Sequence, residues 1–98
     1  MAFPLDPVEV ITPSGVVVAL TGQARERLLA EMAPHESLKA VVEDFLNAGA
    51  SRPVRIPRER KLTVASVIEA IGGDRRGLAG LEGGLYELRN ALVDEMPP

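Results

Sequence analysis

The sequence RPVRIPRERK, residues 52–61, separates two parts of the chain that are both predicted to be mainly helical. Its two prolines exclude a helix interior and a fully paired central strand, because proline lacks the backbone N–H that both require. Val54 and Ile56 alternate with Arg55, which is typical of a short strand with one buried face. We therefore predict a short basic edge strand in mid-chain, with its arginines facing outward.

The charge of the chain is segregated around this stretch. Residues 52–61 carry a net charge of +4, residues 1–51 carry −4 and residues 62–98 carry −3. A basic strip on an acidic body predicts local contact with phosphate or acidic groups, rather than attraction of the whole protein to nucleic acid. The candidate phosphate- or partner-binding residues are Arg52, Arg55, Arg58, Arg60 and Lys61, together with Arg75 and Arg76 further along the chain.

Length and composition indicate one folded domain over residues 1–98. Apolar residues make up 46% and charged residues 26% of the 98 positions, which is ordinary for a globular protein. The absence of cysteine excludes disulfides, thiolate metal sites and thiol chemistry. The N-terminus lacks the features of a signal peptide, and no apolar run is long enough to cross a bilayer. We expect a soluble, cytoplasmic protein without a membrane partner.

The N-terminal part predicts a β-hairpin. An irregular lead-in over residues 1–7 precedes two segments rich in β-branched residues, 8–11 and 16–20. Pro13 and Gly15 lie between them and favour a turn. The second segment is apolar at every position, so we expect it either to be covered on both faces or to pair at an interface between chains.

Apolar residues at helical spacing predict about four helices in the rest of the chain, which makes the fold class α+β. Thr21 and Thr63 are the expected capping residues of the first and third helices. The spacing places Arg25 on the exposed side of the first helix and Leu46 on the buried side of the second. The expected helices cover residues 22–33, 36–48, 64–71 and 85–94, followed by a frayed tail at 95–98.

A leucine seam runs through the glycine-rich C-terminal part. Its members step by three and four residues, as in a short heptad pattern. The seam is either core or an interface with a partner or a second copy. The apolar interface candidates are Leu78, Leu81, Leu85, Leu88 and Leu92.

The sequence carries no pattern typical of catalysis. His35 is the only histidine, and Glu43 and Asp44 are adjacent, so they point in different directions on a helix. No nucleophile elbow, phosphate loop or dinucleotide fingerprint is present. We therefore expect no enzymatic activity, no cofactor and no metal.

The function predicted from the sequence is a non-catalytic protein-interaction module. Such a small adaptor or subunit would bind a partner protein or associate with itself. The alternative is a small regulator that binds nucleic acid like a helix-turn-helix protein, with the basic strip 52–61 and Arg75 and Arg76 as phosphate contacts.

Overall fold

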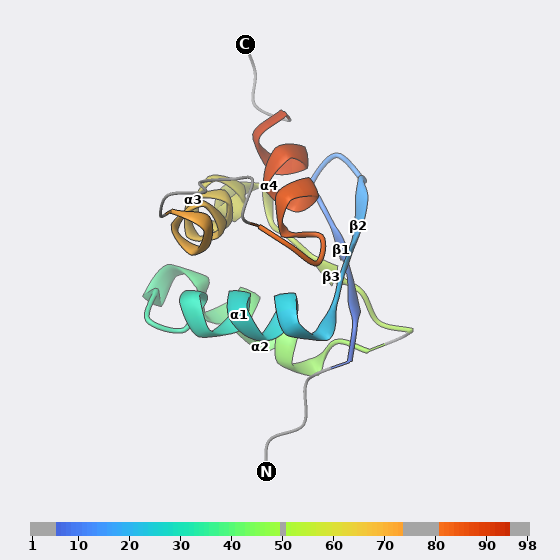
Figure 1. The fold of residues 1–98 in the computed structure, drawn as a ribbon. Helices are drawn as coiled ribbons and strands as arrows, with labels where there is room; N and C mark the ends of the chain where they lie inside the picture. The colour runs from blue at the N-terminus through green and yellow to red at the C-terminus, as the bar shows by residue number, and fades with distance from the viewer. Residues whose placement is uncertain (1–5, 50, 74–80, 95–98) are drawn as a thin grey trace.

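A three-stranded sheet with helices packed on one of its faces forms the fold (Figure 1). The computed structural model describes residues 6–49, 51–73 and 81–94. The predicted α+β class, N-terminal hairpin, four helices and short mid-chain edge strand are confirmed in this part of the chain. The elements are β1 (Val8–Ile11), β2 (Val17–Leu20), α1 (Gly22–Met32), α2 (Lys39–Asn47), β3 (Val54–Arg55), α3 (Lys61–Gly72) and α4 (Leu85–Asp94), with short 3-10 helices η1 (Glu36–Leu38) and η2 (Arg58–Arg60).

The first strand of the chain is the central strand of the sheet. The strand order is β2-β1-β3, so β2 and β3 are both edge strands. β1 pairs with β2 in antiparallel register, with Val10 opposite Val18, and with β3 in parallel register, with Val10 opposite Val54. At the hairpin turn the N–H of Thr12 donates to the carbonyl of Val16 over 2.9 Å, and Gly15 has a φ of +97°.

The sheet is covered on one face only. One set of alternate residues is buried against the helices and includes Val8, Val10, Val18, Leu20, Val54 and Ile56. The other set faces outward, and there Val17 is 53% exposed and Arg55 is also exposed. The expectation that β2 is covered on both faces is therefore wrong, because no helix of the described chain packs on its outward face (Figure 1).

α1 begins as predicted, but one of its side chains lies where the helical pattern did not place it. The hydroxyl of Thr21 caps the helix by accepting a hydrogen bond from the N–H of Ala24 at 3.2 Å. Arg25, predicted to be exposed, is only 3% exposed. Its guanidinium donates to the carbonyl oxygens of Asp6 (2.9 Å), Ala48 (3.0 Å) and Phe45.

The burial of Arg25 has a physical reason at the end of α2. The last four carbonyls of a helix have no partner within the helix, and a positive charge is favoured at this end by the helix dipole. The guanidinium supplies several donors in one plane, so it can serve Phe45 and Ala48 together. The apolar pattern alone assigns every arginine to the solvent side and therefore misses this role.

Two other helical predictions were wrong in detail. Leu46, expected to be buried, is 60% exposed, because the inward face of α2 is set by Val41 and Phe45. Thr63 does not cap α3, which already begins at Lys61. The chain enters this helix through η2, where the N–H of Arg60 donates to the carbonyl of Pro57 at 3.0 Å.

Two glycines join α4 closely to the end of β2. Gly83 and Gly84 have φ values of +67° and +96°, and the carbonyl of Gly83 accepts from the N–H of Thr21 at 3.0 Å. A Cβ on Gly84 would lie 2.1 Å from the carbonyl oxygen of Ala19. Only glycine tolerates both this backbone conformation and this approach. The turn thus sets the position of α4 beside the strand.

Several predictions concern residues outside the described part of the chain. They are the greater part of the irregular lead-in (1–5), the frayed tail (95–98), and Arg75, Arg76 and Leu78. Among the described helices, none combines the length and the apolar composition needed to cross a membrane.

Candidate protein-binding surface

The leucine seam lies in the interior of the described chain. Leu85, Leu88 and Leu92 on α4 are at most 1% exposed, and Leu81 is 7% exposed. They pack in one core with the buried residues of the sheet and of the other helices. These four leucines are therefore not on the surface of the folded chain, where a partner would meet them.

The basic strip lies at the β3 edge and along the approach to α3. Arg52, Arg55 and Arg58 are exposed, whereas Arg60 and Lys61 are partly buried. The side chains of Val54 and Ile56 are 1% and 3% exposed and pack in the core, so they anchor the strip to the rest of the fold. Of the five predicted basic residues, only Arg55 lies in β3, whereas Arg58 and Arg60 lie in η2 and Lys61 begins α3.

The two edges of the sheet differ in how they are protected. β3 has only two residues, with Pro53 before it, Pro57 shortly after it and Arg55 on its outward face. Short strands, prolines and charges are the usual means by which an edge is kept from pairing with another chain. β2 carries neither prolines nor charges, since residues 16–20 are uniformly apolar. The less protected edge is therefore β2.

The register shows which backbone groups β2 presents at this edge. In an antiparallel pair, alternate residue pairs exchange their hydrogen bonds. Counting from the Thr12–Val16 bond, Val18 bonds to β1, so Val17 and Ala19 turn their N–H and C=O groups outward. The bond from the N–H of Thr21 to Gly83 follows the same alternation. This bond occupies the edge at the Thr21 end of β2. In the described part of the chain, the N–H and C=O of Val17 and the N–H of Ala19 remain available for pairing with an added strand.

Two adjoining hollows follow this edge and together form what we call the β2–α4 groove. One has a volume of about 470 Å³ and lies against Val17, Ala19 and the Gly83–Gly84 turn. The other has a volume of about 590 Å³ and lies between Val16 and α4, where Tyr86 and Ala91 contribute to its wall. Glu87 lines both hollows, so they share a wall. Val16 and Tyr86 are 45% and 43% exposed, which leaves apolar surface inside the groove.

The wall that α4 gives to the groove is acidic. Glu87 and Asp94, two turns apart, both line it, with Asn90 between them. The basic residue of the helix, Arg89, is instead directed to α3, where its Nε donates to Glu69 over 2.8 Å. Among the described residues that line the groove there is no lysine, arginine or histidine.

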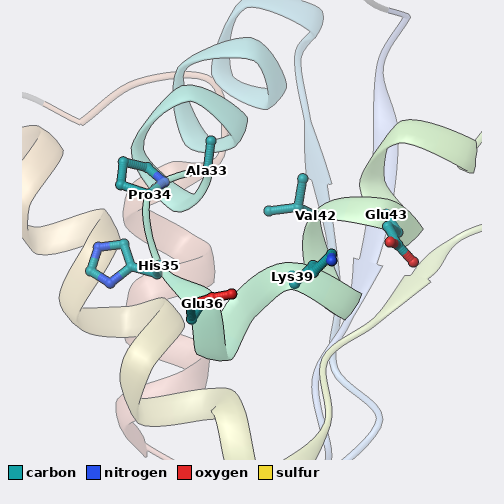
Figure 2. A pocket seen from close by; sticks show the side chains of 7 residues that line it. All are labelled: Ala33, Pro34, His35, Glu36, Lys39, Val42 and Glu43. Atoms are coloured by element: carbon teal, nitrogen blue, oxygen red, sulfur yellow. The ribbon is translucent and has the colours of Figure 1, made fainter.

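A separate pocket of about 450 Å³ lies at the corner where α1 passes through η1 into α2. Figure 2 shows its seven lining side chains, among them His35, Lys39, Glu36 and Glu43. Charges of both signs surround an apolar patch that includes Pro34 and Val42. No serine, threonine or cysteine is among the residues that line this pocket.

The described residues contain no group of three or more histidine, aspartate or glutamate side chains that could hold a metal ion.

The apolar run in the sequence had pointed to β2 as a candidate interface. It could not point to the acidic wall, because that wall depends on how α4 is placed. The chain matches no protein-family model, no curated protein and no solved structure.

Proposed function

We propose that this protein is a non-catalytic interaction module that binds an extended segment of a partner protein by strand addition to β2. The observation that carries the proposal is the contrast between the two sheet edges. β3 is short, flanked by prolines and charged, whereas β2 is apolar and faces a groove. In strand addition, main-chain hydrogen bonds supply affinity and pockets for alternate side chains supply specificity.

The structure supports both halves of this mode of binding. Val17 offers an outward N–H and C=O, and Ala19 an outward N–H, for pairing with an added strand. Every second side chain of that strand would turn toward α4, because α4 packs on the same face of the sheet as Val18. The apolar surface of Val16 and Tyr86 lies there to receive it.

Peptide selection with two variants of one residue tests this function. Random linear peptides displayed on phage are selected on the immobilised chain, and their affinities are then measured by fluorescence polarisation. Val17→Pro removes the outward N–H and keeps the ladder to β1, whereas Val17→Ala shortens the side chain and keeps the N–H. We expect selected peptides to lose about fivefold in affinity for Val17→Pro relative to Val17→Ala, since the lost bond is worth about 1 kcal/mol.

Amide exchange on the wild-type chain makes the test independent of the fold of the proline variant. We expect the amides of Val17 and Ala19 to exchange rapidly in the free protein and to become protected when a selected peptide is added. If no peptide is enriched, or if bound peptides leave these two amides unprotected, strand addition at β2 is wrong.

A second candidate function is nucleic-acid binding through the basic strip, which the exposure of Arg52, Arg55 and Arg58 favours. Binding to duplex DNA would then weaken with salt, with a log–log slope of about −0.9 for each phosphate contacted. The double variant Arg55→Glu/Arg58→Glu should keep the fold, because both side chains are exposed, and should remove this binding. If wild-type protein shows no binding at low salt, this candidate is excluded.

A further inference from the structure

The β2–α4 groove also restricts the chemistry of the segment that it can accept. We infer that the segment added to β2 carries both apolar residues and lysine or arginine among the side chains that face α4, and that it comes from a different protein rather than from a second copy of this chain. This inference rests on the proposed function and specifies its partner.

Charge complementarity is the first argument. The helix wall of the groove presents Glu87 and Asp94, and the described lining residues include no base. The nearest base on that helix, Arg89, is already paired with Glu69 on α3. An incoming positive side chain would therefore meet two carboxylates at the rim of the groove, and no cation among the described lining residues would compete for them. Charges in such positions select partners and steer association.

Every second side chain of the added segment faces α4, so the basic and the apolar side chains that enter the groove belong to the same face of that segment. Side chains of the added segment that turn toward α4 meet Val16, Tyr86 and Ala91 at one point, and Glu87 or Asp94 at another. Successive residues on one face of a strand lie about 7 Å apart, which allows an apolar and a basic side chain to enter the groove together.

A second copy of the chain does not supply this chemistry. Pairing of β2 with β2 would bring residues 16–20 of each copy to the groove of the other, and these five residues carry no charge. The paired strands would then bring no positive side chain to Glu87 and Asp94 of either copy. The basic strip cannot enter in their place as a strand, because two prolines limit β3 to two residues.

The test compares two pairs of carboxylates that change the net charge equally. Glu87→Gln/Asp94→Asn neutralises the groove wall, and Glu43→Gln/Asp44→Asn neutralises two exposed carboxylates on α2 as a matched control. Peptides selected on the wild-type chain, and shown to be sensitive to Val17→Pro, are measured against both. We expect the groove variant to bind about three- to tenfold more weakly at low salt, and the control to bind as wild type. The difference should shrink toward about 0.3 M salt, because such rim charges are screened.

The outcomes separate this inference from the proposed function. If peptides depend on Val17 but contain no lysine or arginine, or if both double variants bind them equally, strand addition stands and the basic partner is wrong. If light scattering shows a dimer that Val17→Pro dissociates into monomers, the occupant is a second copy and the inference is overturned.

Discussion

Replacement of Gly84 by alanine should destabilise the protein far more than the same replacement at Gly15. The two glycines have nearly the same φ, +96° at Gly84 and +97° at Gly15. A Cβ added at Gly15 meets nothing within 4 Å, whereas at Gly84 it would lie 2.1 Å from the carbonyl oxygen of Ala19. Comparing the two variants therefore separates the stability lost by placing a side chain at positive φ from the stability lost by the clash between the turn and β2.

The magnitudes follow from these contacts. At Gly15 only the strain of positive φ is added, which costs about 1 kcal/mol. At Gly84 the same strain is joined by an overlap that requires the turn to retreat by about 1 Å. That movement weakens the bond from Thr21 to Gly83 and displaces Leu85, which is 1% exposed in the core. We expect a total loss of roughly 3–5 kcal/mol, as for an overpacked core with a lost hydrogen bond.

Urea unfolding followed by far-ultraviolet circular dichroism measures both variants. For a domain of this size the total stability is about 5–15 kcal/mol, so Gly84→Ala removes a large share of it, while Gly15→Ala leaves most of it. With a slope of about 1–2 kcal/mol per molar urea, the two midpoints should be well separated. Equal losses for the two variants, within about 0.5 kcal/mol, would show that the approach of the turn to Ala19 does not position α4.

Three further measurements test other contacts of the fold. Arg25→Met keeps most of the volume but leaves three carbonyls without a donor, so unfolding should become easier by about 2–4 kcal/mol in urea titrations; an unchanged midpoint would refute the capping role. Thr21→Ala removes the cap of α1 and should cost about 1 kcal/mol, whereas Thr21→Ser should restore most of it. A double-mutant cycle between Arg89 and Glu69 should give a coupling energy of only about 0.5 kcal/mol, since both side chains are partly exposed; a value above about 2 kcal/mol would contradict this.

Local patterns predicted most of the fold because each depends on residues close in sequence. Residues 54–55 form the expected edge strand, since alternation and flanking prolines leave few other conformations. Arg25 was misplaced because the carbonyls that it serves belong to segments about twenty residues away in either direction. The start of α3 was placed too late because η2 adds a turn that Pro57 can initiate without a capping side chain.

The candidate site was less predictable than the fold. The apolar run 16–20 indicated a surface shared with another chain. Which of its side chains and backbone groups face outward, however, depends on the register of the hairpin. The acidic wall exists only because the turn at Gly84 brings α4 to β2, which no local pattern reveals. The leucines, in contrast, suggested an interface by their spacing, and four of them lie in the core.

The parallel pairing of β1 with β3 has a consequence for the synthesis of the protein. Val10 is made before its partner, Val54, which follows more than forty residues later in the chain. Until then the hairpin has two open edges, while α1 and α2 are already complete in sequence. Contacts distant in sequence form late, and unpaired strand edges are prone to aggregate. The nascent chain therefore passes through a stage at which its future central strand is exposed, and this stage ends only when the proline-flanked segment has been made.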